Sequence, residues 1–117
     1  MLDFVRLFVL LMAGHALADY ALQSTEMVVL KNPTRPEAFD IDGEKMGPWW
    51  WWMTAHALIN GLVVYVITGA FWALCYEAFM HWLLDWSKCR GGLTTHADQL
   101  GHIIIKAIIA GACTWVS

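Results

Sequence analysis

Residues 77–88 read EAFMHWLLDWSK, and this stretch decides which fold class the sequence predicts. The stretch is apolar enough for a lipid bilayer, yet it carries Glu77, His81 and Asp85 at intervals of four residues. Residues four apart lie on one face of an α-helix, about one turn apart. The stretch therefore predicts a membrane helix with a single polar stripe. That stripe has to face other helices, because a charge exposed to lipid is costly.

Three further stretches have the length and apolar character of a membrane helix, which needs about 20 residues. The four predicted helices are residues 4–22, 49–67, 70–86 and 97–116, and a polar loop covers residues 31–47. The sequence thus predicts an all-α fold with a single membrane domain over residues 1–117. Its architecture is a four-transmembrane-helix bundle, integral to the membrane.

The composition favours the same class of protein. Of 117 residues, 59% are hydrophobic and only 15% are charged, whereas soluble domains carry about 25% charged residues. The net charge of −3 gives no reason to expect a nucleic acid as partner. Membrane lipids are the expected partners, and the chain could also form a homo-oligomer. Cys75, Cys89 and Cys113 form no CxxC pair, which argues against a thiolate zinc site.

Two local features each have two interpretations. The run PWWWW at residues 48–52 could stack a ligand, but a helix start at Pro48 followed by Trp residues at the headgroup level is favoured. Residues 16–18 read Ala-Leu-Ala, the form of a signal-peptidase site. Asp3 beside Arg6 leaves the preceding segment without net positive character, so we expect the first helix to be retained.

The basic residues predict the orientation in the membrane. The loops between the first and second helices and between the third and fourth contain Lys31, Arg35, Lys45, Lys88 and Arg90. The opposite face has Arg6 near its edge. The positive-inside rule therefore predicts a multi-pass protein of the inner (cytoplasmic) membrane, with residues 31–47 and 87–95 in the cytoplasm and both termini outside.

The other predicted helices carry polar residues at the same spacing. These residues are His15, Asp19 and Gln23 on the first, His56 and Asn60 on the second, and Asp98, His102 and Lys106 on the fourth. At about 1.5 Å of rise per residue, the histidines of the four polar stripes come to roughly 7 to 10 Å from the cytoplasmic ends of their helices. Asp19 and Asp85 are shallower, and Asp98 is at the mouth. The sequence therefore predicts one polar layer shared by four helices.

A second group falls deeper in the predicted bundle. Glu77, Lys106 and Asn60 come to roughly 13 to 16 Å from the cytoplasmic ends. We expect Glu77 and Lys106 to form an intramembrane ion pair, with Asn60 completing their hydrogen bonds, because a lone charge near mid-bilayer costs about 2.5 to 3.5 kcal/mol. The pair is interpreted as structural, with a catalytic or proton-relay role for Glu77 as the alternative.

The shallower layer is suited to a divalent metal, since His and carboxylate side chains are ligands for zinc, iron and manganese. Zinc is the expected ion. The candidate ligands are His15, Asp19, His81, Asp85, His102 and Asp98, and Asp98 is also a candidate catalytic base. His56, Gln23 and Gln99 are expected to orient these ligands. Because six candidates exceed the needs of one zinc ion, either two metals bind or some carboxylates act as bases. The simpler alternative is a hydrogen-bonded His/Asp network that only joins the helices.

The combined pattern also resembles a known family. Its order is H-x3-D-x3-Q, then a histidine, then H-x3-D-x2-K, then D-Q-x2-H, carried by His15, Asp19, Gln23, His56, His81, Asp85, Lys88, Asp98, Gln99 and His102. This order is similar to the small integral-membrane family of bacteria and phages called domain of unknown function 3307. The resemblance implies a polytopic membrane protein and brings no settled activity. The chain departs from the family in a longer loop 31–47 and in Asn60, where a second histidine is expected.

A more distant likeness, at the level of the fold, is to membrane-bound metal-dependent hydrolases. A bound divalent ion activates water and polarises carbonyl or phosphoryl oxygens. We therefore expect a metal-binding membrane protein that hydrolyses a lipid or membrane-borne substrate near the cytoplasmic face. The alternatives are a non-enzymatic phage or bacterial membrane protein, holin-like or a helper subunit, a proton or metal carrier, and a bis-histidine haem bundle.

Overall fold

The structure, a computed structural model, describes residues 2–22, 31–32, 40–41, 44–45 and 49–115. Its helices are α1 (Leu2–Ala16), continued by the π-helical turn η1 (Leu17–Ala21), then α3 (Trp49–Thr68), α4 (Phe71–Cys89) and α5 (Thr95–Trp115). Two minimal strands, β1 (Asp40–Ile41) and β2 (Glu44–Lys45), pair antiparallel within the predicted polar loop. Apart from this hairpin, the described part of the chain is all-α with four helices, as the sequence predicts.

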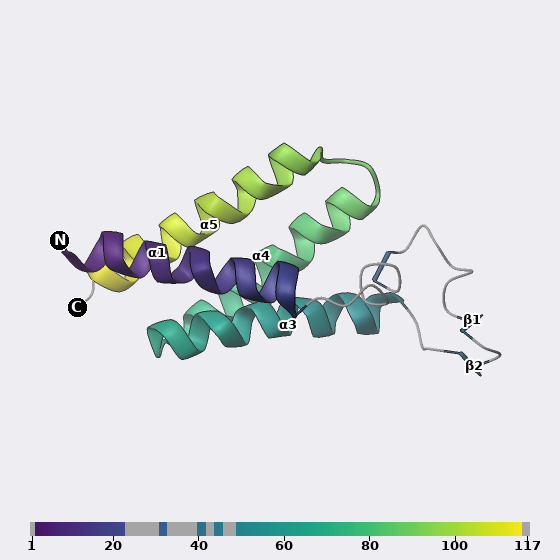
Figure 1. The fold of residues 1–117 in the computed structure, drawn as a ribbon, viewed down its shortest axis with the longest axis horizontal. Coiled ribbons are helices and arrows are strands. Elements are labelled where there is room, and N and C mark those ends of the chain that lie inside the picture. The colour runs from purple at the N-terminus through teal and green to yellow at the C-terminus, as the bar shows by residue number, and fades with distance from the viewer. Residues whose placement is uncertain (1, 23–30, 33–39, 42–43, 46–48, 116–117) are drawn as a thin grey trace.

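The helices run alternately in opposite directions (Figure 1). The N-terminus of α1, the α3–α4 turn and the C-terminus of α5 lie at one end, which we call the terminal end. The C-terminal end of α1, the start of α3 and the α4–α5 connection lie towards the other end, which we call the loop end. Both α1 and α4 pack against α3 and α5. Because neighbouring helices run in opposite directions, residues near the C-terminal end of one helix lie beside residues near the N-terminal end of the next.

Glycines in the left-handed backbone region close the two short connections. Gly69 (φ 70°) makes the turn between α3 and α4, and Gly91 (φ 80°) follows the end of α4. Glycine adopts this region without the penalty other residues have. Helix α4 extends to Cys89, three residues beyond the predicted end at residue 86. At the start of α5, the hydroxyl of Thr94 accepts a hydrogen bond from the Ala97 N–H at 3.1 Å, which caps the helix.

The interior of the bundle has an apolar half and a polar half. The apolar half lies towards the terminal end, and its buried cluster is Leu11, Val64, Ala73, Ile105, Ile109 and Ala110. The polar half lies towards the loop end. Among the described residues, eleven buried side chains are polar or charged and nine are hydrophobic. Soluble proteins rarely bury charged residues in this proportion, so the interior of this bundle needs a specific explanation.

The outer surface is apolar on every helix. Its exposed large hydrophobic side chains include Val5 and Val9 on α1, Leu62 and Val66 on α3, Phe71 and Phe79 on α4, and Ile104 and Ile108 on α5. Monomeric soluble proteins rarely expose apolar surface on this scale. We therefore expect lipid or another protein to cover this apolar surface.

Two helical segments are long and apolar enough, by length and composition, to cross a membrane. They are Asp3–Ala21, with a mean hydropathy of 1.4, and Trp49–Thr68, with 1.3. Helices α4 and α5 have 19 and 21 residues but carry more charged and polar side chains. By this criterion two of the four predicted spans are supported. The charged residues that make α4 and α5 more polar, such as Glu77, Asp85 and Lys106, are buried inside the bundle.

Candidate metal centre

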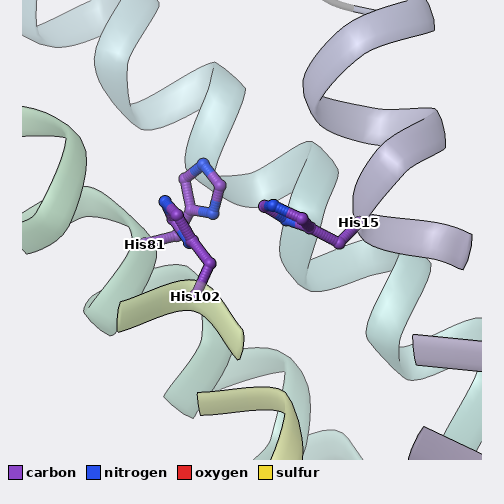
Figure 2. Close-up of side chains that lie close together, drawn as sticks. All are labelled: His15, His81 and His102. Carbon is purple, nitrogen blue, oxygen red and sulfur yellow. The ribbon is translucent and has the colours of Figure 1, made fainter. Parts of the chain in front are cut away.

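Each of the four helices contributes one buried histidine to the polar half. His15, His56, His81 and His102 are all at most 3% exposed. The ring centroids of His81 and His102 are 4.4 Å apart, those of His15 and His102 are 4.8 Å apart, and those of His56 and His81 are 4.8 Å apart. Figure 2 shows the imidazoles of His15, His81 and His102 pointing towards one another from α1, α4 and α5. The histidines of the four polar stripes predicted from the sequence thus meet in one layer of the bundle.

A close approach of α3 and α4 brings two of these histidines together. A Cβ atom on Gly61 of α3 would lie 2.9 Å from the Leu74 carbonyl oxygen and 3.2 Å from the Ala78 Cβ of α4. Only glycine permits this backbone distance. About one turn along each helix, His56 Nε2 and His81 Nε2 are 3.0 Å apart.

These two nitrogens form a small triangle with Asp19. His56 Nε2 is 3.0 Å from Asp19 Oδ1, and His81 Nε2 is 3.3 Å from the same oxygen. In a tetrahedral zinc site with metal–ligand distances of about 2.0–2.1 Å, the ligand atoms are about 3.3 Å from one another. The triangle has these dimensions. Three protein ligands with one open position are typical of catalytic zinc sites.

The π-helical turn η1 places Asp19 at the triangle. The N–H of Leu22 donates to the carbonyl of Leu17 at 2.9 Å, five residues earlier, so the backbone is wider here than in α1. Asp19 is 8% exposed. Single π-helical turns inside or at the end of α-helices are frequent at functional sites, and nothing in the sequence predicted this one.

Asp85 connects the triangle to a second group of ligand atoms. Its Oδ2 is 3.2 Å from His56 Nε2 and 3.6 Å from His81 Nε2. Its Oδ1 is 3.8 Å from His102 Nε2, which in turn is 3.4 Å from Asp98 Oδ1. The two oxygens of one carboxylate therefore face two groups that could each hold a cation: Asp19, His56 and His81, and Asp85, Asp98 and His102.

The third group with metal-ligand spacing consists of His15, His81 and His102. It shares His81 with the triangle and His102 with the second group. The groups are therefore parts of one continuous cluster, which we call the His/Asp cluster: His15, Asp19, His56, His81, Asp85, Asp98 and His102. All six candidate ligands of the sequence analysis belong to it. His56, for which the sequence suggested an orienting role, lies among the ligand atoms themselves.

Unpartnered buried atoms provide a test of whether a cation fits the cluster. Both ring nitrogens of His102 and the Oδ1 atom of Asp98 are buried and have no hydrogen-bond partner among the described residues. A buried polar group without a partner costs about 1–3 kcal/mol. Since His102 Nε2 and Asp98 Oδ1 face one another at 3.4 Å, a cation beside them would satisfy both. The donor set therefore fits a divalent metal.

Lys106 and Glu77, for which the sequence predicts an ion pair, lie next to the cluster on the side of the terminal end. Lys106 Nζ is 2.7 Å from Glu77 Oε1, and both side chains are at most 1% exposed. Asn60 does not complete this pair as expected, because its Nδ2 donates to the His56 carbonyl in its own helix at 3.0 Å. A lone asparagine on α3 is satisfied by the nearest carbonyl one turn back.

Glu77 also contacts the cluster. His81 Nδ1 is 3.3 Å from the same Glu77 Oε1. Because a carboxylate only accepts hydrogen bonds, a neutral His81 donates from Nδ1 and keeps its lone pair on Nε2. That nitrogen is the one that faces Asp19 and His56. A histidine held in one tautomer by a carboxylate is the arrangement found around metal-ligating imidazoles.

Gln99 has a similar relation to His15. His15 Nε2 is 3.3 Å from Gln99 Oε1, which also accepts a hydrogen bond from the Tyr20 hydroxyl at 3.2 Å. His15 Nδ1 is buried without a partner among the described residues. The orienting role expected of Gln99 is consistent with these contacts. Gln23, which has the same expected role, lies outside the described residues.

A pocket of about 300 Å³ opens beside the cluster. Its lining residues are Asp19, Tyr20, Lys31, Asn32, Asp85, Lys88, Cys89, Asp98 and Gln99. Lys31 Nζ is 2.6 Å from Asp85 Oδ2, and Lys88 Nζ is 3.7 Å from Asp98 Oδ2. From the sequence, Lys31 indicated only the orientation in the membrane, and Lys88 was also part of the family pattern. Lys88 follows Asp85 on α4, whereas Lys31 and Asp85 are 54 residues apart in the sequence, and residue spacing does not encode their contact.

The chain was compared with known families, curated proteins and solved structures. Over residues 7–117 it matches the family described as "Protein of unknown function (DUF3307)". The chain belongs to this family. The DUF3307 match includes every residue of the His/Asp cluster, the Glu77–Lys106 pair and both pocket lysines, as the resemblance in the sequence implied. No curated protein and no solved structure matches the chain.

Proposed function

We propose that this member of the DUF3307 family is an integral-membrane, metal-dependent hydrolase that acts on a lipid or another membrane-borne substrate. The observation that carries the proposal is the triangle of His56 Nε2, His81 Nε2 and Asp19 Oδ1, with sides of 3.0, 3.0 and 3.3 Å. Its Asp19 corner lines the pocket of about 300 Å³. A metal held there would be within reach of a substrate in the pocket.

The placement of apolar side chains on the surface and of charged side chains in the interior, the reverse of a soluble protein, supports the membrane part of the proposal. The exposed side chains of α4 and α5 include many large apolar ones, while four charged residues of these helices are buried: Glu77, Asp85, Asp98 and Lys106. A lipid-exposed helix needs an apolar outer face, and its ionisable residues face the bundle interior. We therefore propose that all four helices cross the inner membrane, with both termini outside and residues 31–47 and 87–95 in the cytoplasm, on the side of the positive charges.

Charge balance supports a cation at the cluster. Four buried carboxylates lie in or beneath it: Asp19, Glu77, Asp85 and Asp98. Three lysines face three of them, namely Lys106, Lys31 and Lys88. Asp19 contacts His15, His56 and His81. Among the described residues these carboxylates outnumber the lysines by one, which favours a cation here, and imidazole with carboxylate is a ligand set that suits zinc.

The side chains can be assigned separate roles in hydrolysis. A bound divalent ion would activate water and polarise the bond to be cleaved. Asp98 lines the pocket and has a buried Oδ1 atom that is unpartnered in the described structure, so it is placed to take a proton from the attacking water. Glu77 does not line the pocket and contacts His81 instead, so we assign it a positioning role. Gln99 would position His15 in the same way.

The second candidate is a structural His/Asp network, and one contact favours it. The Lys31 ammonium, 2.6 Å from Asp85 Oδ2, already neutralises one carboxylate of the cluster. One protonated imidazole would then balance the remaining charge without a metal. A carrier is less well supported, because the interior on the terminal side of Glu77 and Lys106 is the apolar cluster of Leu11, Val64 and Ile109 in the described bundle.

The hydrolase is tested on detergent-purified protein with a chromogenic carboxylate ester and a chromogenic phosphodiester. We expect hydrolysis that is lost with a chelator and restored by zinc. Asp98→Asn should lower the rate about 10²- to 10⁴-fold, the usual effect of removing a general base. Asp3→Asn, which removes an exposed carboxylate at the terminal end, is the control and should keep the wild-type rate. Hydrolysis that is insensitive to the chelator, or equal in Asp98→Asn and wild type, contradicts the proposal.

A further inference from the structure

We infer that the pocket beside the His/Asp cluster is a phosphate-binding subsite, in which Lys31 and Lys88 hold the phosphate of a phosphate-ester substrate. The inference rests on the proposed function, because it assumes a metal at the cluster. It goes further by naming the chemical class of the substrate and two residues that bind it.

The geometry places both lysines between the pocket and the metal-ligand atoms. Both line the pocket. The Lys31 side chain is 9% exposed and its Nζ is 2.6 Å from Asp85 Oδ2. The Lys88 side chain is 40% exposed and its Nζ is 3.7 Å from Asp98 Oδ2. Each ammonium therefore contacts a carboxylate that is also a candidate metal ligand.

Metal binding would change what these ammonium groups contact. The oxygens that face Lys31 and Lys88 belong to the carboxylates that would bind or face the cation. A divalent ion at those carboxylates repels the ammoniums and takes up oxygen lone pairs that had accepted their hydrogen bonds. Each lysine ammonium has three N–H donors and no acceptor. With metal bound, both lysines would need acceptors from within the pocket.

The charge of the pocket points to an anion as that acceptor. The described residues that line it include three carboxylates, Asp19, Asp85 and Asp98, and two lysines. One divalent cation changes the summed charge of these five side chains from minus one to plus one. Phosphate offers several oxygens to a metal and to two lysines at once, and lysine is a common phosphate ligand. The volume of about 300 Å³ is at the lower end for ligand pockets, which suits a headgroup or a small ester.

The test measures binding of inorganic phosphate and glycerol phosphate by calorimetry, on zinc-loaded protein in detergent, with metal content determined on each sample. Lys88→Gln should weaken binding about ten-fold, as expected for one charge-assisted hydrogen bond. Lys31→Gln should weaken it at least as much. Lys88→Gln is the decisive variant, because its partly exposed side chain can be replaced without leaving a buried cavity. Arg90→Gln is the matched control, since Arg90 stacks on Trp86 and does not line the pocket.

The outcomes separate the two proposals. If phosphate binds equally to wild type, Lys88→Gln and Arg90→Gln, the subsite is overturned whatever the metal content. If the protein holds no metal, the proposed function fails, and phosphate binding that still depends on Lys88 supports the subsite alone. In nanodiscs, competition between phosphatidylglycerol and glycerol phosphate identifies a lipid headgroup as the source of the phosphate. Undiminished binding of glycerol phosphate there identifies a soluble ester.

Discussion

Among the individual residues, Glu77 combines full burial with contacts to both a lysine and a histidine. It is fully buried, and its Oε1 atom is 2.7 Å from Lys106 Nζ and 3.3 Å from His81 Nδ1. Neither the carboxylate nor the ammonium can remain charged in a bundle interior without the other. The same oxygen that neutralises Lys106 also sets the tautomer of His81. Stability and the geometry of the proposed centre therefore depend on one side chain.

The Glu77–Lys106 pair should show strong thermodynamic coupling. Glu77→Gln and Lys106→Met each leave one buried charge without its partner, so each should destabilise the fold by about 3–5 kcal/mol. The double variant removes both charges and should be more stable than at least one of the single variants. The measurement is thermal unfolding in detergent, followed by circular dichroism. Additive losses in the double variant would mean that the two charges do not interact.

The sequence could predict much of this residue-level arrangement, and the limits have physical reasons. Helical geometry fixes which face each residue occupies, so spacing alone predicted that His15, His81 and His102 face one interior. The contact of His56 with Asp19 involves the π-helical turn, and its contact with His81 involves the close α3–α4 approach. Lys31 reaches Asp85 across 54 residues of sequence. Residue spacing contains no information about a contact between residues so far apart in the sequence.

At the level of the helices, α4 and α5 decide between two membrane topologies. Hydropathy alone supports crossing by the segments Asp3–Ala21 and Trp49–Thr68. The apolar outer faces of α4 and α5 support four crossings. Mean hydropathy treats all positions alike, so it cannot recognise a helix whose mid-helix charges face the bundle interior. Burial in the structure separates interior from surface positions, and the sequence anticipated this separation only through the four-residue ladders.

Cysteine labelling distinguishes the two topologies. In a chain with its three native cysteines replaced, Asp3→Cys and His96→Cys place one thiol at each end of the bundle, both at exposed positions. With four crossings, a membrane-impermeant maleimide should label Asp3→Cys from outside intact cells and His96→Cys only in inverted vesicles. If only α1 and α3 cross, α4 and α5 remain on the side where the chain began. Both thiols would then react from the same side, and the four-span proposal would be lost.

For the whole molecule, the distribution of polarity is the feature that connects fold and function. The bundle has apolar residues on its surface, an apolar core towards the terminal end, and a cluster of histidines and carboxylates towards the loop end. Burial of this many ionisable groups would consume a large part of the roughly 5–15 kcal/mol by which folds are stable. A cation bound at the cluster would offset that cost, because a ligand that binds only the folded state stabilises it by mass action. The composition indicated a membrane protein, but the pocket became visible only in three dimensions.

The central claim is that the His/Asp cluster binds a divalent metal, and elemental analysis of detergent-purified protein tests it most directly. We predict one or two equivalents of zinc or a similar metal per chain in wild type, and a clear loss in His56→Asn and His81→Asn. The control is His96→Asn, because His96 is exposed and lies outside the cluster; it should keep the wild-type content. Wild-type protein without stoichiometric metal, or equal content in all four proteins, would contradict the claim and leave the structural network as the explanation of the cluster.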